Sequence, residues 1–424
     1  MQIIQIQEKT KPLKVLISTY ACRPGNGSDP GIGWNTVREL VKQHQVWAIT
    51  RNDNRPFIEA ELAINPIPQL HFVYYDLPAW VQWWKREQKG VQLHYYLWQI
   101  GAYGLARQLQ SEIGFDLSHH VTYVKYWGPS FLALLPVPFV WGPVGGGESA
   151  PKAFWQDFGL RGKTYETLRD IARWVGERDP LVNLTARRSV VALAATQDTA
   201  KRLSALGCKR VELCEVASLP EADFNCLMQL PVVCQKPRFI SIGRLLHWKG
   251  FHLGIRAFAQ ANLPDAEYWI IGDGPEAKQL QELTEELGIT EQVKFWSKLP
   301  RDQTLQRLGE CTALVHPSLH DSGGWVSLEA MAAGRPVICL DLGGPAIQVT
   351  EETGFKVSAH TPEQVVQDLA EAMTRLAQDA DLRMQMGQAG QKRIVEAYGW
   401  EAKGQFLLNL YDDVLNLDKV KVPT

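Results

Sequence analysis

Residues 238–250 read RFISIGRLLHWKG, and this stretch decides how the chain folds. Its first five residues predict a β-strand, and Gly243-Arg244 follow directly. Lys249 and Gly250 come five residues later. A glycine after a strand lets the backbone approach a ligand, while arginine and lysine donate hydrogen bonds to phosphate oxygens. The stretch therefore predicts a strand that leads into a phosphate-binding loop.

Strand candidates alternate with helix-patterned segments on both sides of this stretch. Downstream they cover 268–271, 293–296, 313–316 and 337–340. Upstream they cover 14–19, 46–50, 71–75, 116–121, 139–141 and 190–194. The alternation is typical of βαβ units that build a parallel sheet. An irregular stretch from about 216 to 236 separates the two series.

The expected fold class is α/β, with two Rossmann-like, doubly wound parallel-sheet domains that face a cleft. A chain of 424 residues is too long for one ordinary core and suits two domains. We place the first domain at 1–218 and the second at 219–400. A last amphipathic helix, about 401–420, is expected to cross back and complete the first domain. Ligands in such sheets bind outside the carboxyl ends of the strands, so the loops that follow strands are the place to look.

Composition narrows the function classes. With 45% hydrophobic residues, 21% charged residues and a net charge of -2, the chain is globular and lacks the basic field that nucleic-acid binding needs. We expect neither a secretory signal nor a membrane span, because no suitable apolar run appears. The seven cysteines lack metal-site spacing, which favours free thiols in a reducing cytoplasm.

Two further loops follow strands of the second domain. The first is Gly272-Asp273-Gly274-Pro275, which could also be an ordinary tight turn. The second, 317–325, reads PSLHDSGGW. Its free N–H groups near Ser322, Gly323, Gly324 and Trp325 would favour a diphosphate at a helix start.

Asp321 and Glu329 bracket the start of that expected helix. If the segment between them is helical, they differ by about 12 Å along the axis and by about 80° around it. An N-cap role for Asp321 stays open at this point. Glu329 has apolar neighbours in the sequence, so its carboxylate needs a partner.

These motifs resemble glycosyltransferase family 4. The resemblance is carried by Gly243-Arg244 with Lys249-Gly250, by the loop 272–275, and by the Asp321 to Glu329 segment that ends in Ala333-Gly334-Arg335-Pro336-Val337. It covers about 236–360 closely and the first domain more loosely. It implies retaining enzymes of the two-Rossmann-domain GT-B architecture.

The resemblance also implies roles for single residues. Arg244 and Lys249 would bind the donor pyrophosphate, Glu329 the ribose hydroxyls, and the carboxylate at 321 the donor sugar. The donor-binding set is Gly31, Gly33, Gly243, Arg244, Lys249, Gly272, Gly274, Ser322, Gly323, Gly324, Trp325 and Glu329. The family usually has glutamate where this chain has Asp321. One missing methylene withdraws the carboxylate by about 1.3 Å, and a misplacement near 1 Å can lower a rate about 100-fold.

The first domain resembles the family in three places. The loop 22–33, before a helix expected near Trp34, resembles the family's glycine-rich loop, although a plain turn stays open. His119, at the end of a strand, takes the position of the family's catalytic histidine, with His120 as second choice. Together with Asp321, Arg244 and Lys249, His119 forms the expected catalytic set. The loop with Gly145, Gly146, Gly147 and Glu148 is expected to line the cleft on the acceptor side.

An aromatic and basic stretch lies between 80 and 98. It contains Trp80, Trp83, Trp84, Lys85, Arg86, Lys89, Tyr95, Tyr96 and Trp98. Such residues suit a membrane interface or stacking on a sugar. Helical spacing equally fits an aromatic core stripe, and the sequence leaves both interpretations open.

The expected function is retaining transfer of a sugar from a nucleoside-diphosphate sugar to an acceptor hydroxyl, in polysaccharide or glycolipid synthesis. We expect no metal and no cofactor, a saccharide or lipid-linked acceptor, and a cytoplasmic location with peripheral contact to the inner face of the cell membrane. Alternatives are a catalytically silent nucleotide-sugar binding protein, suggested by Asp321, and an epimerase or phosphorylase on the same fold.

Overall fold

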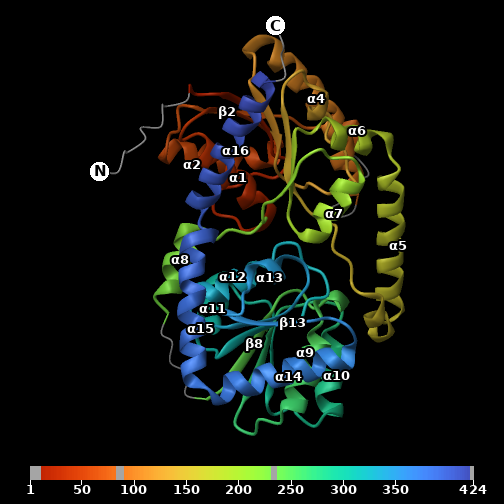
Figure 1. Cartoon of the computed structure of the whole chain (residues 1–424), viewed down its shortest axis with the longest axis vertical. Helices are drawn as coiled ribbons and strands as arrows, with labels where there is room; N and C mark the ends of the chain where they lie inside the picture. Colours follow the sequence, from red (N-terminus) through yellow and green to blue (C-terminus); the bar gives the residue numbers. More distant parts are fainter. Residues whose placement is uncertain (1–10, 83–89, 231–235, 421–424) are drawn as a thin grey trace.

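The computed structural model describes residues 11–82, 90–230 and 236–420. Two α/β halves follow one another along the long axis of the molecule (Figure 1). The first contains a seven-stranded sheet in the order β3-β2-β1-β4-β5-β6-β7, and the second a six-stranded sheet in the order β10-β9-β8-β11-β12-β13. Their strand pairs are parallel. This doubly wound order confirms the expected α/β class.

The strands of the first sheet are β1 Lys14–Ser18, β2 Gln45–Thr50, β3 Leu70–Tyr74, β4 Leu117–His120, β5 Phe139–Val144, β6 Val191–Ala194 and β7 Val211–Leu213. Those of the second are β8 Arg238–Ile242, β9 Glu267–Ile271, β10 Val293–Trp296, β11 Ala313–His316, β12 Val337–Leu340 and β13 Gly354–Val357. Central strands such as β6 and β11 are buried along their whole length, because helices cover both faces of each sheet.

The helices of the first half are α1 Ser28–Leu40, η1 Asn52–Asn54, α2 Arg55–Ile64, α3 Ala79–Gln82, α4 Val91–Ile113, η2 Phe131–Leu134, η3 Lys152–Asp157, α5 Leu160–Glu177, α6 Pro180–Arg188 and α7 Gln197–Ala205. Those that follow are α8 Glu221–Met228, η4 His247–Lys249, α9 Phe251–Ala261, α10 Ala277–Glu286, α11 Arg301–Gly309, α12 Trp325–Ala332, α13 Gly343–Gln348, α14 Pro362–Gln378, α15 Ala380–Arg393, η5 Ile394–Tyr398 and α16 Trp400–Val420.

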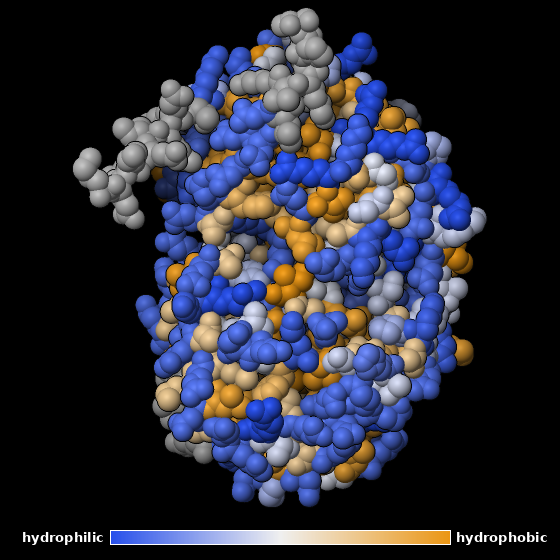
Figure 2. Space-filling model, in the orientation of Figure 1, coloured by the Kyte–Doolittle hydropathy of each residue, from blue (hydrophilic) through white to orange (hydrophobic). Residues whose placement is uncertain are grey.

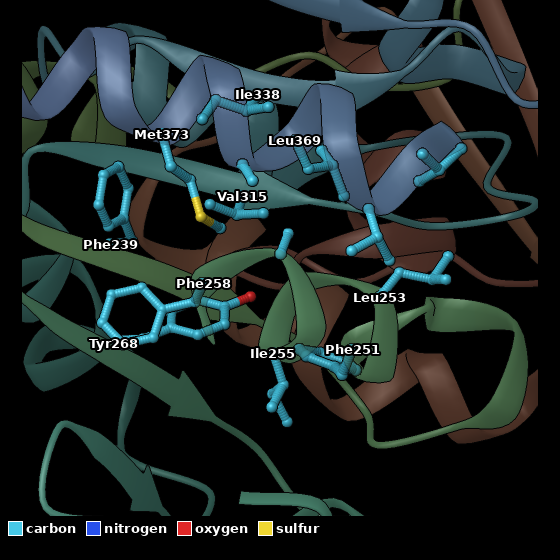
Figure 3. Packing of buried hydrophobic residues seen from close by; sticks show 14 of the residues in the cluster. Phe239, Phe251, Leu253, Ile255, Phe258, Tyr268, Val315, Ile338, Leu369 and Met373 are labelled. Carbon is cyan, nitrogen blue, oxygen red and sulfur yellow. The ribbon is translucent and has the colours of Figure 1, made fainter. Parts of the chain in front are cut away.

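The core of the second half shows how a helix pair covers a sheet face. Side chains of α9 and α14 meet those of β8, β9 and β11, with Phe258, Tyr268 and Met373 among the residues in view (Figure 3). Each of these three side chains is almost wholly buried. Thr361 caps α14 by accepting a hydrogen bond from the N–H of Gln364, so the helix begins where its sequence signals a start.

Two edge strands and one short helix escaped the sequence analysis. β7 and β13 carry Glu212 and Lys356 and are partly exposed, so neither presents the apolar run that marks a buried strand. α8 lies inside the stretch that was expected to be irregular.

The expected start of α1 was wrong. The helix begins at Ser28, not near Trp34, so Gly31 and Gly33 lie inside it and are buried. A Cβ at Gly33 would meet the carbonyl oxygen of Ala21 at 2.2 Å. These two glycines therefore let α1 pack closely on the preceding loop.

Segments cross between the halves in both directions. α16 runs from the second half back to the first (Figure 1), where Tyr411 packs against the α1 side of the sheet. In the opposite direction, η3 leaves the first half, and Phe154 and Phe158 are buried in the core of the second half. The expected boundary assigns these two phenylalanines to the first domain, whereas their side chains belong to the second core.

The aromatic stretch divides into different environments. Tyr95 and Trp98 are buried in the first core, whereas Trp80 is 78% exposed. Residues 83–89, with Trp83, Trp84, Lys85, Arg86 and Lys89, lie outside the described residues. Within the described part of the chain, no helix has both the length and the hydropathy that crossing a membrane requires.

Candidate functional site

A cleft of about 520 Å³ lies between the two halves, at the carboxyl ends of their strands. Loops after β4 and β5 line it from the first half, and the loops after β8 and β11 line it from the second. The predicted residues that the structure brings together here are Gly145, Gly146, Lys249, Asp321, Ser322, Gly323 and Trp325. The cleft is thus where the strand-end argument placed it.

Asp321 is the most highly coordinated side chain of the cleft. Its Oδ2 atom accepts hydrogen bonds from Lys249 Nζ and, at 3.2 Å, from His316 Nε2. Its Oδ1 atom accepts from the N–H groups of Gly323 and Gly324, each at 3.2 Å. Burial would raise the pKa of Asp321, but the charge of Lys249 and the bond from His316 outweigh it and hold this pKa well below its usual range. Asp321 is therefore an ionised carboxylate whose two oxygens are both occupied by protein donors.

This geometry corrects the expected helix start. α12 begins at Trp325 with Gly324 as its N-cap in the left-handed region, φ 54°, so 321–324 is a loop. The helical spacing assumed between Asp321 and Glu329 therefore does not exist. Two of the N–H groups that were expected to be free for a diphosphate already donate to Asp321.

Glu329 lies on α12, is only 4% exposed, and has the partner that its surroundings demand. Arg301, at the start of α11, approaches it to 2.8 Å and also binds Asp223 of α8. Burial raises the pKa of Glu329 against the opposing charge of Arg301. Glu329 does not line the cleft as the structure stands. Sequence reasoning missed Arg301, although it follows the strand β10.

The loops after β8 and β9 pack on each other beside the cleft. A Cβ on Gly272, φ 143°, would lie 1.9 Å from the carbonyl oxygen of Gly243, and one on Gly274 would meet the backbone of Leu245. The predicted glycines are therefore needed for loop-to-loop contact. Arg244 is exposed and does not line the cleft as the structure stands.

His119 and His120 do not reach the cleft, which corrects the expected catalytic histidine. Both are fully buried on β4. The ring of His119 bonds through Nδ1 to the hydroxyl of Tyr411 and through Nε2 to the carbonyl of Gly142, each at 2.6 Å. His120 Nε2 is bonded to Tyr95 at 3.0 Å. Burial lowers the pKa of His119 to about 4 and that of His120 to about 3, so both rings are neutral parts of the core.

Glu148 was also expected to line the cleft, but it is buried, with 2% of its surface exposed. Its Oε1 atom accepts hydrogen bonds from Thr196 and Thr199, at 2.6 and 3.0 Å. Its Oε2 atom accepts one from Ser322 of the other half, at 2.7 Å. Gly147, whose N–H donates to Thr199, is likewise buried behind the loop. Glu148 therefore fastens the glycine loop to the loop that holds Asp321.

A second connection between the halves comes from α5. Glu166 accepts hydrogen bonds from His247 at 3.0 Å and from His320 at 3.1 Å, both in the second half. Burial would raise the pKa of Glu166, but these two bonds outweigh it and hold the pKa far below the usual value. Trp248 stacks between Tyr165 and His320, with ring centroids 4.9 and 5.1 Å apart. This cluster closes one end of the cleft.

Several residues of the cleft were not predicted. Asp29, Lys125, Trp127, Tyr165 and Arg169 line it from the first half. Lys125 and Trp127 follow β4, so the search of strand ends could have found them. Burial, followed by the charge of Arg169, lowers the pKa of Lys125. No sequence signal marks Tyr165 and Arg169, because they come from the middle of a helix.

Comparison with known proteins supports this assignment. A family model described as glycosyl transferases group 1 matches residues 229–393. These residues form a group 1 glycosyltransferase domain. They contain the loops after β8, β9 and β11, hence Lys249 and Asp321.

Relatives of this glycosyltransferase domain carry the names of different enzymes. D-inositol 3-phosphate glycosyltransferase of Corynebacterium jeikeium is 31% identical over 183 residues, 41% of this chain and 42% of that protein. Alpha-maltose-1-phosphate synthase of Mycolicibacterium smegmatis is 30% identical over 205 residues, 46% of this chain and 52% of that protein. The chain thus matches only about half the length of these curated relatives.

Solved structures extend the likeness beyond the glycosyltransferase domain to nearly the whole chain. Sucrose-phosphate synthase from Thermosynechococcus elongatus superposes with a TM-score of 0.63 at 17% identity, covering 96% of this chain and 100% of that one. The Anabaena protein HepE, in complex with UDP and glucose, gives 0.59 at 17% identity, covering 95% and 100%. At this identity the likeness concerns the fold, and the fold is GT-B.

Proposed function

We propose that this protein is a retaining glycosyltransferase that moves a sugar from a nucleoside-diphosphate sugar to an acceptor hydroxyl in polysaccharide or glycolipid synthesis. The observation that carries the proposal is the cleft between the halves, where Lys249 and the 321–325 loop of the glycosyltransferase domain face the glycine loop after β5. A nucleotide-sugar donor would bind on the second half and the acceptor on the first. HepE, which holds UDP and glucose in its structure, supports UDP as the first nucleotide to try.

Negative charge grows on the departing pyrophosphate during such a transfer. Lys249 and, after a rotation of its exposed side chain, Arg244 would stabilise that charge. Asp321 holds the ammonium of Lys249 in place through the ion pair. The aspartate side chain, shorter than the glutamate usual in the family, would thus serve to hold Lys249 and not to contact the donor sugar. We propose Asp321 as a positioning residue for Lys249.

The acceptor half of the cleft combines cations with aromatic planes. Lys125 and Arg169 face the cleft beside Trp127 and Tyr165, and Trp248 of the second half stacks on Tyr165. Aromatic planes stack on sugar rings, and the two cations favour an acceptor that also carries a negative charge. The names of both curated relatives contain a sugar or inositol phosphate, which agrees with this choice. We therefore propose a saccharide acceptor with an anionic group.

The first experiment measures thermal shifts and product formation with UDP-, GDP- and ADP-sugars, on the wild type and on Glu329→Ala. A shift with one nucleotide that Glu329→Ala abolishes would support the donor site and name the base. No shift with any nucleotide sugar in a folded sample would overturn the proposal. Binding without turnover over a broad set of acceptors would favour the silent binding protein instead.

A further inference from the structure

Helix α5 buries polar side chains and exposes apolar ones, the reverse of an ordinary surface helix. The residues that it buries are Gly162, Glu166, Arg173 and Gly176. Its outward face carries Leu168, Ile171, Trp174 and Val175, exposed by 61, 52, 57 and 55%. In Figure 2 a few separate hydrophobic residues are visible at the right-hand edge of the molecule, the side on which Figure 1 draws α5. Soluble proteins rarely leave such a contiguous apolar face open without a use for it.

The polar side of α5 is turned inward because it fastens the cleft. Glu166 receives the bonds from His247 and His320, and Arg173 donates to the carbonyl oxygen of Gly146 at 2.6 Å. These buried partners explain the inward face. They do not explain why aliphatic and indole groups occupy the outward one, which none of the described residues covers.

Basic side chains border the apolar face and lie over its indoles. Lys152 Nζ is 3.4 Å from the ring centroid of Trp155 on the adjacent η3, and the guanidinium of Arg178 is 4.1 Å from that of Trp174. Arg161 and Lys163, in the first turn of α5, are also exposed. A shallow groove of about 330 Å³ separates Trp155 from Trp174.

Acidic groups on this face are already neutralised. Asp170, which borders the groove, is paired with Lys152 at 2.9 Å and with Arg173 at 3.6 Å. Glu177, at the end of the helix, is paired with Arg202 at 2.9 Å. Lys152 is therefore balanced by Asp170, and the border of the apolar face is positive through Arg161, Lys163 and Arg178.

We propose that the outward face of α5, together with Trp155 of η3, docks on the surface of an anionic lipid bilayer. Aliphatic side chains with tryptophans between them, flanked by lysine and arginine, are what an interfacial helix needs to enter the headgroup region. A second copy of this chain fits less well. A symmetric contact of this face with itself would bring its unpaired cations together.

The position of α5 gives this docking a consequence for the cleft. Tyr165 and Arg169, which line the cleft, belong to the same helix as the docking face. A bilayer bound along α5 therefore lies next to one end of the cleft. The inference stands independently of the proposed transfer reaction, because it uses none of the donor-binding residues.

The test is cosedimentation of the full chain with vesicles at low ionic strength, using phosphatidylcholine alone or with about a third phosphatidylglycerol. The wild type should bind the anionic vesicles at least about tenfold more strongly than the neutral ones. The double variants Leu168→Glu/Ile171→Glu and Arg161→Ser/Arg178→Ser should each weaken that binding about tenfold or more. Ile64→Glu is the matched control, since Ile64 is 76% exposed on α2, and it should bind as the wild type does.

Circular dichroism and the nucleotide-dependent thermal shift check that the α5 variants remain folded with an intact donor site. Wild-type protein that stays in the supernatant with anionic vesicles overturns the proposal, as does equal binding by Leu168→Glu/Ile171→Glu. A dimer that this double variant converts to a monomer, without vesicle binding, would assign the face to a second copy. A missing nucleotide shift alongside normal vesicle binding would count against the proposed transfer reaction alone.

Discussion

Ser322 of the second half donates a hydrogen bond to Glu148 of the first, with 2.7 Å between Oγ and Oε2. The bond joins the loop after β11 to the loop after β5, directly beside the cleft. Because Ser322 is the neighbour of Asp321 in the chain, the relative position of the halves is coupled to the residue that orients Lys249.

Removing either partner of this bond should have unequal effects. Ser322→Ala leaves Glu148 with its two threonine donors and should lower the free energy of unfolding by about 0.5–1.5 kcal/mol. Glu148→Ala removes the acceptor that the buried hydroxyls of Thr196 and Thr199 share, and among the described residues only Thr196 has another one, Thr199 Oγ1 at 3.1 Å, so this variant should cost about 1–3 kcal/mol. Urea denaturation measures both. Equal effects would mean that the threonines find other acceptors.

Lys249→Ala should separate a donor-binding role from a structural one. If Lys249 binds the pyrophosphate, the variant loses the thermal shift with nucleotide sugar, and kcat/KM falls about 100-fold or more. If its only role is to neutralise Asp321, melting temperature falls while the shift with ligand stays. The control is Lys278→Ala, because Lys278 is 86% exposed on α10.

Arg301→Ala should destabilise the protein because it removes the ion-pair partner of Glu329. Glu329 is buried, and without its main partner its carboxyl group must either stay charged in the interior or take up a proton, both at a cost in stability. Since Arg301 is half exposed, we expect a loss of about 1–3 kcal/mol, less than for a fully buried pair. Arg55→Ala breaks an exposed pair with Glu59 and should cost about 0.5 kcal/mol or less. If the two variants lose similar stability, Glu329 does not depend on Arg301.

Acid should unfold the protein partly through its buried histidines. The pKa of His119 is lowered to about 4 and that of His120 to about 3, so their unfolded rings take up protons at a higher pH than the folded ones. Stability is therefore lost as the pH falls below about 6.5 toward 4, by about 1.4 kcal/mol per pH unit for each ring. Glu166, with its depressed pKa, adds a further loss below about pH 4.3.

Urea denaturation from pH 7.5 down to pH 4.5 measures this dependence. His119→Gln should flatten the profile, whereas His360→Gln, at an exposed position, should leave it unchanged. A variant at His119 with the wild-type pH profile would show that the ring is not neutral in the folded state.

Metal removal should leave the proposed reaction intact. The charge on the leaving pyrophosphate would be met by Lys249 and Arg244, so we expect product formation to be unchanged after dialysis against EDTA. Activity that is lost with EDTA and restored by magnesium or manganese would overturn this expectation.

The sequence predicted the strands that are buried on both faces, because each presents a short apolar run between turn signals. It missed β7 and β13, where an edge position allows Glu212 and Lys356 into the strand. It also misplaced the starts of α1 and α12. At both places a residue with positive φ sets the boundary, Ser28 at 58° and Gly324 at 54°, and helix propensity does not mark such a position.

The part of the candidate site that is built from loops after strands was predictable from the sequence. Lys249, Asp321 and Gly145 were found by that route. The burial of His119 was not predictable, because its hydrogen-bond partner Tyr411 is 292 residues away in the chain. The contribution of Tyr165 and Arg169 depends on a helix that crosses between the halves, and no local pattern encodes that path.

The contact between α16 and α1 constrains how the chain can mature on the ribosome. The first sheet is complete once β7 has emerged, yet Tyr411, which supplies the partner of His119 and part of the core around it, is made nearly two hundred residues later, on the order of ten seconds at usual synthesis rates. Until then the groove beside α1 stays open. The first half should therefore be susceptible to proteases and in need of chaperones throughout synthesis of the second, even though every strand of its sheet has already been made.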